Sequence, residues 1–174
     1  VKVNMVVQKG VNEDSILPMV EQFRNTPVIL RFIEFMDVGN ANQWQLEHVY
    51  TAAQIRGLIQ TRFPIQPLDP NYTGEVAERW SLTDGSGEIG IISSISQPFC
   101  NDCSRARLSA IGEIYNCLFA SKGHDLRAPL RKGTSDDILR EMIAAIWQAR
   151  DDQYSMERSA ETQSNAVKVE MSYI

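Results

Sequence analysis

Three cysteines are the residues of this sequence with the most specific chemistry. Cys100 and Cys103 have the spacing CxxC, and Cys117 follows after thirteen intervening residues. An odd number of cysteines does not form a disulfide framework. A CxxC pair can hold two thiolates on one metal centre, and a turn at Ile111-Gly112 would return the third thiol towards them. The spacing therefore favours metal binding.

Three interpretations of these cysteines remain open from residue types alone. They could be buried structural thiols, because free cysteine is among the most buried residue types. They could form a structural zinc site with His124 as the fourth ligand of a tetrahedron. The third interpretation is a 4Fe-4S cluster. Such a cluster normally takes four cysteines, so three would leave one iron open to another ligand and suggest substrate binding.

Two arginines follow the CxxC pair directly. If residues 103–108 are extended, Arg105 and Arg107 point to the same side. Their guanidinium groups would then form a fork suited to phosphate oxygens. The alternative is an ordinary pair of solvated charges on a strand. A neighbouring metal site in a net-acidic protein shifts the balance towards an anionic ligand.

Lys2 and Arg31 lie on strands that otherwise appear buried. A charge inside an apolar strand such as VILRFIEF is costly unless it is paired. Arg31 could pair with Glu34 or with a residue outside this sequence. Alternatively, both cations could line a cavity that receives a polyphosphate, and the sequence alone does not decide between these interpretations.

The elements that position these residues begin with a βαβ unit. Residues 1–7 alternate as a strand does, with Lys2, Asn4 and Val6 on one face; residues 16–23 have helical spacing, and residues 28–35 form an apolar strand. This order predicts a parallel sheet. The loop that starts at Met36 follows the second strand, where such sheets usually carry function.

The rest of the chain predicts shorter elements. Residues 51–62 favour a helix, and Pro64, Pro67 and Pro70 favour a linker or irregular loop. Two strands are expected on either side of a turn at residues 84–87, and two more at 105–110 and 113–118. A helix is expected over 135–149, followed by an extended tail over 151–174. The apolar face of that helix comprises Ile138, Leu139, Met142, Ile143 and Ile146.

Composition narrows the class of protein. The 174 residues are 43% hydrophobic, with a net charge of −5 and a pI of about 5.1. This is the balance of a soluble globular protein with a core, and it argues against a nucleic-acid binder, which would carry a basic excess. No apolar run is long enough for a membrane span and no signal peptide is visible, so a cytoplasmic location is expected. The start at Val1, within a strand-like pattern, suggests a fragment.

Several stretches together resemble the C-terminal half of the radical-SAM GTP 3′,8-cyclases of molybdenum cofactor biosynthesis. They are PFCNDCSRARLSAIGEIYNCLF, RFIEFMDVGN, KVNMVVQKGVN and GHDLRAPLR. The resemblance runs from Lys2 to about Trp147. It implies an α/β fold: the C-terminal part of an incomplete TIM-type (radical SAM) barrel, followed by an α+β C-terminal domain. Residues 1–40 would end the barrel, residues 41–150 would form an iron–sulfur and GTP-binding domain, and residues 151–174 would be a tail.

The resemblance also implies roles for individual residues. The family converts GTP to 3′,8-cyclo-7,8-dihydro-GTP, and a partner enzyme then forms cyclic pyranopterin monophosphate. An N-terminal 4Fe-4S cluster cleaves S-adenosylmethionine, while a C-terminal 4Fe-4S cluster with three cysteine ligands binds the guanine. Matched by position, the cluster ligands are Cys100, Cys103 and Cys117. The matching GTP-binding residues are Lys2, Arg31, Arg105, Ala106 and Arg107. Met36 matches a residue that contacts S-adenosylmethionine.

The sequence departs from this family in two ways. It has no CxxxCxxC motif, which holds the S-adenosylmethionine cluster, so we expect the chain alone to be inactive. The family usually ends in a Gly-Gly pair, whereas residues 171–174 read MSYI. A sheet lacking half of its barrel would have open edges, and a homodimer is therefore one expected partner, together with GTP.

Overall fold

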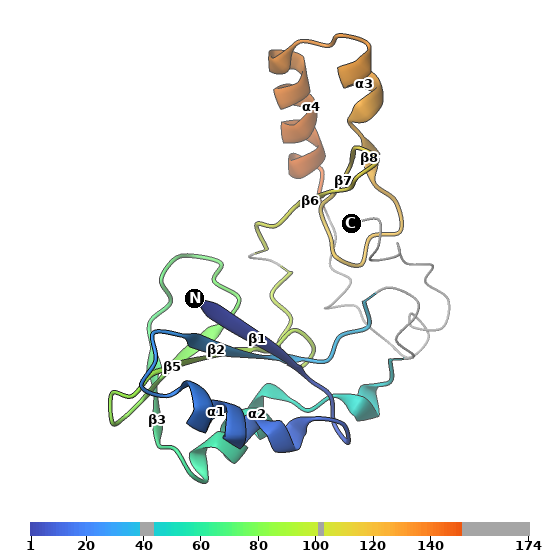
Figure 1. Cartoon of the computed structure of the whole chain (residues 1–174). Coiled ribbons are helices and arrows are strands. Elements are labelled where there is room, and N and C mark those ends of the chain that lie inside the picture. Colours follow the sequence, from blue (N-terminus) through green and yellow to red (C-terminus); the bar gives the residue numbers. More distant parts are fainter. Residues whose placement is uncertain (39–43, 101–102, 151–174) are drawn as a thin grey trace. The chain divides into compact units, whose positions relative to one another are not determined.

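The computed structural model describes residues 1–38, 44–100 and 103–150. The chain divides into two compact units (Figure 1). The first unit contains Val1–Met36 and Trp44–Asp102, and the second contains Asp37–Gln43 and Cys103–Ile174. Residues 41–150, expected as one C-terminal domain, are thus shared between both units. The tail expected over 151–174 lies outside the described residues.

The first unit is built on a five-stranded sheet with the order β1-β2-β5-β4-β3. Its strands β1 (Lys2–Val7), β2 (Ile29–Glu34) and β5 (Glu88–Ile92) are parallel. Strands β4 (Glu78–Leu82) and β3 (Ile65–Leu68) complete it as antiparallel neighbours. The expected βαβ unit and the α/β class are confirmed, and so is the hairpin between β4 and β5.

Two helices cover one face of this sheet (Figure 1). They are α1 (Ile16–Phe23) and α2 (Ala52–Gln60), accompanied by the short 3₁₀ turns η1 (Glu13–Ser15) and η2 (Leu46–His48). Helix α2 begins at a capping box in which the Thr51 hydroxyl accepts from the Gln54 N–H, as sequence favours at a helix start. Between the helices and the sheet lies the core, which includes Phe32 and Ile55, both fully buried.

The opposite face of the sheet carries polar side chains. The register aligns Asn4 on β1 with Arg31 on β2, Gly90 on β5 and Arg79 on β4. Residues in one such row point to the same side. Lys2, two residues before Asn4, also lies on this face, and the exposure of alternate β1 residues confirms the face predicted for this strand. We call it the polar face.

Strand β3 corrects the expectation of an irregular loop at the prolines. Pro67 lies within this strand, opposite Trp80 of β4. Proline has no N–H for a ladder and is therefore confined to edge strands. Because β3 is at the edge of the sheet, Pro67 is compatible with it.

The second unit contains a three-stranded antiparallel sheet and two helices. The strands are β6 (Arg107–Leu108), β7 (Glu113–Tyr115) and β8 (His124–Asp125), in that order. They confirm the two predicted strands in shorter form. Gly112 turns the chain between β6 and β7 with φ of 82°, in the left-handed region.

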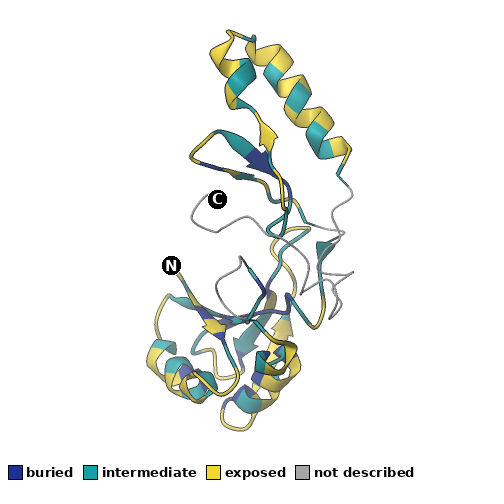
Figure 2. Cartoon of the chain, turned by 90° about the vertical axis from the view of Figure 1, so that its right-hand side faces the viewer, coloured by how far each residue is buried: buried dark blue, intermediate teal, exposed yellow. Residues whose placement is uncertain are grey.

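Helices α3 (Arg127–Arg131) and α4 (Asp136–Gln148) follow these strands. The helix predicted over 135–149 is confirmed. Figure 2 shows α4 as a helix of exposed and half-buried residues. Its apolar face is only partly covered within the described residues: Leu139, Met142 and Ile146 are half-buried, while Ile138 and Ile143 are exposed. No helix in the described parts of the chain has the length and apolarity needed to cross a membrane.

Candidate metal and nucleotide site

The thiol of Cys103 is held by the arginine two residues after it. The Nε and Nη2 atoms of Arg105 donate to the Cys103 Sγ at 3.3 and 3.1 Å. Burial alone would raise the pKa of this thiol, but the hydrogen bonds and charge of Arg105, with the charge of Arg150, outweigh burial and lower it. A thiolate is the form that ligates metals. The local geometry thus favours the thiolate form of Cys103.

Arg107 and Cys117 belong to the same electrostatic neighbourhood. Burial and the like charge of Arg105 lower the pKa of Arg107, while the charges of Cys103 and Cys117 partly offset this. Both cysteines therefore act on one guanidinium group. Cys117 Sγ also accepts from the Phe119 N–H at 3.4 Å. These interactions couple Arg107 electrostatically to Cys103 and Cys117.

The predicted alternation after the CxxC pair agrees with the structure. Arg105 and Arg107 are half-buried, whereas Ala106 between them is exposed. Arg107 is the first residue of β6 and lies opposite Tyr115 of β7. Tyr115 in turn lies over Gly123, where an added Cβ would come within 2.7 Å of its ring. Tight packing of this hairpin fixes where the arginines emerge.

The end of helix α4 braces both cysteines of the second unit. The Asn116 side chain, next to Cys117, donates to the carbonyl of Ile146 at 3.1 Å. The guanidinium of Arg150 donates to the backbone carbonyl of Cys103. Sequence reasoning missed Arg150 and Asn116, because neither lies in a recognisable motif and both act through tertiary contacts.

The remaining cysteine is assigned to the other compact unit. Cys100 is a half-buried residue of the first unit, while Cys103 and Cys117 belong to the second. Within residues 1–38, 44–100 and 103–150, no group of three or more His, Cys, Asp or Glu side chains is gathered as a metal site. His124 is exposed on β8 opposite Ile114.

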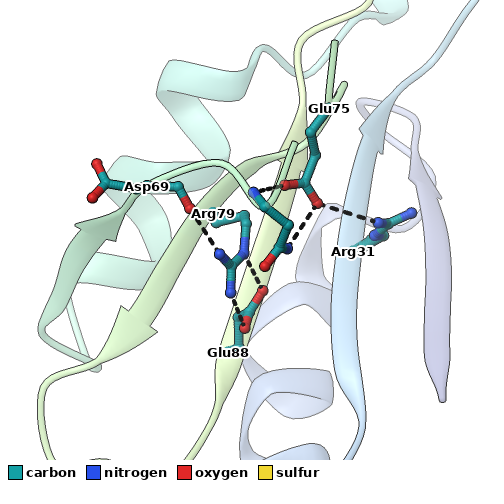
Figure 3. A network of polar contacts seen from close by, with 6 residues as sticks. Arg31, Asp69, Glu75, Arg79 and Glu88 are labelled. Atoms are coloured by element: carbon teal, nitrogen blue, oxygen red, sulfur yellow. Dashed lines mark hydrogen bonds and ion pairs between the residues drawn. The ribbon is translucent and has the colours of Figure 1, made fainter. Parts of the chain in front are cut away.

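Arg31 projects from the polar face beside a carboxylate that the sequence did not indicate. Its Nη2 atom lies 4.0 Å from Oε1 of Glu75 (Figure 3). The expected pairing with Glu34 is wrong: Glu34 faces the helices and is fully buried there. Gly90 leaves the space that Arg31 fills, since a Cβ at this position would lie 3.0 Å from the Arg31 Cγ.

Glu75 interacts electrostatically with both Arg31 and Lys2, the two cations identified from the sequence of this unit. Its Oε2 accepts from the Asn71 backbone N–H at 2.6 Å, and only 2% of its side chain is exposed. Burial would raise the pKa of Glu75, but the hydrogen bonds from Asn71 and the charges of Arg79 and Lys2 lower it. Lys2 and Arg31, both flagged from sequence, therefore share one carboxylate partner. Glu75 lies in a loop with no motif, so the sequence held no signal for it.

Arg79 is a third cation of this face, but its charge is already matched. It forms a two-pronged pair with Glu88 at 2.8 and 2.9 Å, and it also donates to the carbonyl of Asp69 (Figure 3). Arg31 differs, because its one ion pair within the described residues is the 4.0 Å contact with Glu75. Its guanidinium group is therefore held less closely by protein carboxylates than that of Arg79.

A pocket of about 470 Å³ opens beside these charges within the first unit. This volume falls in the range of small-molecule sites. Its lining combines polar and aromatic side chains, including Glu75, Arg79, Trp80, Ser93, Gln97 and Phe99. Phe99 immediately precedes Cys100, so the pocket lies next to the chain segment that carries this cysteine. Met36, the expected S-adenosylmethionine contact, is half-buried just after β2.

Comparison with known proteins decides the family. The family model described as Molybdenum Cofactor Synthesis C matches residues 28–156. The chain belongs to this family. A GTP 3′,8-cyclase of Xanthomonas campestris pv. campestris (strain B100) is 54% identical over 170 residues, which cover 98% of this chain and 49% of the relative.

Two further members of the group of relatives give the same result. A GTP 3′,8-cyclase of Xanthomonas axonopodis pv. citri (strain 306) is 53% identical over 159 residues, 91% of this chain and 47% of the relative. One of Staphylococcus aureus (strain JH9) is 47% identical over 177 residues, 100% of this chain and 52% of the relative. The chain thus spans about half the length of the curated relatives that it matches. The resemblance to the cyclase family of molybdenum cofactor biosynthesis is confirmed.

Proposed function

We propose that this chain is the GTP-binding portion of a GTP 3′,8-cyclase, with Cys100, Cys103 and Cys117 as ligands of a 4Fe-4S cluster. The observation that carries the proposal is the Cys103 thiol, which receives two N–H donors from Arg105 and whose pKa is lowered. When bound, a cluster with three cysteine ligands offers one iron on which the guanine of GTP can bind. The relatives named above supply the reaction class.

The basic residues of the chain would hold the rest of the nucleotide. Arg31 faces the same side of the sheet as Lys2, and guanidinium groups suit phosphate oxygens. Arg105 and Arg107, with Ala106 between them, would complete the contacts to GTP. Holding both ends of the substrate fixes the ribose for attack, which is the main contribution a protein makes to cofactor chemistry.

The sheet of the first unit supports the proposed relation to a TIM-type barrel. Its parallel strands β1, β2 and β5 carry helices on one face and polar residues on the other. In a barrel enzyme the site forms at the carboxyl ends of the parallel strands, where Met36 follows β2. We assign Met36 to S-adenosylmethionine on this basis. The product would pass to the enzyme that forms cyclic pyranopterin monophosphate.

The test begins with anaerobic reconstitution with iron and sulfide, followed by titration with GTP while the electron paramagnetic resonance of the cluster is recorded. We expect a cluster signal that shifts when GTP is added. One zinc per chain and no iron would contradict the proposal. In that case, loss of zinc on His124→Ala would identify the zinc module with Cys100, Cys103 and Cys117.

A matched pair of variants tests the phosphate contact. Arg31→Gln should weaken GTP binding by about 10- to 100-fold, the effect of one charge-assisted contact, and should leave guanosine binding unchanged. Arg62→Gln is the control, because Arg62 is exposed and pairs with Glu21 on the surface. Equal GTP affinity in both variants would remove Arg31 from the site. The chain has three cysteines, Cys100, Cys103 and Cys117, and no CxxxCxxC motif. The chain alone should therefore form no cyclised GTP.

A further inference from the structure

Glu34, the last residue of β2, is a fully buried carboxylate with four hydrogen bonds. Its Oε1 accepts from the Ala52 N–H at 2.6 Å and from the Ser96 hydroxyl at 2.5 Å. Its Oε2 accepts from the N–H groups of Ile95 and Ser96 at 2.7 and 2.8 Å. A buried carboxylate is costly unless its oxygens are satisfied, and here every donor comes from outside its own strand.

Three of the four donors lie on a segment that leads to a predicted metal ligand. Residues 93–100, which we call the cysteine-bearing segment, run from the end of β5 to Cys100. The Ser94 hydroxyl adds a contact at 3.4 Å to the backbone carbonyl of Glu34. Both ends of Glu34, side chain and backbone, therefore hold this segment.

The same residue is close in sequence to the predicted S-adenosylmethionine contact. Strands β2 and β5 are adjacent and parallel, and Ile33 pairs with Ile92 near their ends. The carboxyl ends of the two strands therefore lie side by side at the same end of the sheet. Met36 follows β2 there, and the cysteine-bearing segment follows β5. Within the first unit, the hydrogen bonds of Glu34 therefore connect the end of β2, which leads to Met36, with the cysteine-bearing segment.

We propose that Glu34 is a positioning residue that fixes Cys100 relative to Met36. This inference rests on the proposed function, because it assigns Cys100 to the cluster and Met36 to S-adenosylmethionine. The reaction requires the radical source and the ribose to meet within close contact, and displacements of about 1 Å are costly to such reactions. The Glu34 carboxylate sets this spacing because it belongs to the strand that leads to Met36 and accepts hydrogen bonds from the backbone of the cysteine-bearing segment.

Replacement by glutamine tests the grip with little change of shape. An amide has one acceptor oxygen, and its NH₂ group cannot accept. Glu34→Gln therefore loses either the bond from the Ala52 N–H, because the Ser96 hydroxyl can turn to accept from the new NH₂ group, or the two bonds from the Ile95 and Ser96 N–H groups. We expect the cysteine-bearing segment to open more often in this variant while the sheet remains folded.

The matched control is Glu88→Gln on the same sheet. Glu88 pairs with Arg79 and, among the residues that the structure describes, forms no hydrogen bond or ion pair with the cysteine-bearing segment. The first readout is the alkylation rate of each cysteine in the metal-free chain, resolved by mass spectrometry. Glu34→Gln should speed alkylation of Cys100 about 10-fold, as expected for a local opening, and leave Cys117 unchanged. Glu88→Gln should change neither.

The second readout is the reconstituted chain. Glu34→Gln should lower the iron content and broaden the resonance of the cluster, and Glu88→Gln should not. Equal effects of the two variants, or none, would overturn the proposal. If Glu34→Gln does not fold, Ser96→Ala removes one of the four bonds and should shift Cys100 alkylation in the same direction by less. Should wild-type chain take up no iron, the proposed function fails while the alkylation comparison still tests Glu34.

Discussion

Arg105 has two demands on a single guanidinium group. The resemblance gives it a contact to GTP, whereas the structure shows two of its nitrogens on the sulfur of Cys103. Hydrogen bonds to a thiolate ligand outside the metal shell tune such centres. A guanidinium has five N–H donors, and Arg105 uses two of them on this sulfur. Its action on the Cys103 thiol is therefore the part of its role that the structure makes testable.

The thiol reactivity of Cys103 tests this role in the metal-free chain. Since the pKa of Cys103 is lowered through Arg105, more of it is thiolate at a given pH. Arg105→Gln should raise that pKa, move the midpoint of the alkylation profile to higher pH and slow alkylation at neutral pH. Arg131→Gln, on an exposed residue of α3, should leave the profile in place. An unchanged profile in Arg105→Gln would mean that the arginine does not act on the thiol.

At the scale of elements, the turn between β6 and β7 determines whether the hairpin forms that lies between Cys103 and Cys117 in the sequence. Gly112 has a left-handed φ, and an added Cβ would lie 2.8 Å from the Cβ of Arg127. Its carbonyl also accepts from the N–H groups of Leu126 and Arg127. The turn therefore joins the hairpin to the start of α3.

A pair of glycine variants separates backbone strain from steric conflict. Gly112→Ala should lower the free energy of unfolding of the second unit by about 1–3 kcal/mol, because strain and contact add. Gly133→Ala should cost only the lower part of this range, since its φ of 77° is strained but nothing lies within 4 Å of an added Cβ. Urea unfolding followed by circular dichroism measures both. Equal losses would show that the contact with Arg127 relaxes without cost.

The sequence predicted the elements whose periodicity is strong. Helix α2 and the βαβ unit follow from repeating apolar positions, and the cysteines and arginines from a compact motif. Strand β3 was missed because Pro67 normally ends a strand, and its edge position, which only the fold provides, makes it acceptable. Glu34 and Glu75 were missed for a related reason. Glu34 is buried against donors far along the chain. Glu75 has a donor only four residues away in Asn71, but the fold alone brings it beside Arg31.

At the scale of the whole molecule, strand β1 has a partner on one side only within the described sheet. The Ile29 N–H donates to the Val1 carbonyl. The backbone N–H and C=O groups of odd-numbered β1 residues therefore point towards β2, and those of even-numbered residues point towards the other edge of the strand. The carbonyl of Val6 at this edge is already occupied by the Asn12 side chain at 2.9 Å. In the part of the chain that the structure describes, the backbone groups of Lys2 and Asn4 at this edge form no comparable hydrogen bond.

An open edge of this kind predicts self-association of the chain. We expect sedimentation velocity to show a dimer as concentration rises, because unpaired strand edges template pairing. Asn4→Pro removes an edge-facing N–H from each copy without touching the ladder to β2, and it should weaken a twofold dimer by about 2 kcal/mol, the net value of two hydrogen bonds. A monomer at every concentration would show that the edge does not pair.

Pro67, at the far edge of the same sheet, decides how large such an assembly can become. Two chains joined through β1 by a twofold axis would present only β3 edges to the outside, and both would carry this proline. An isologous contact closes on itself, and a proline-blunted edge offers a poor template for a third strand. We therefore expect association to stop at two chains and not to continue into a fibre.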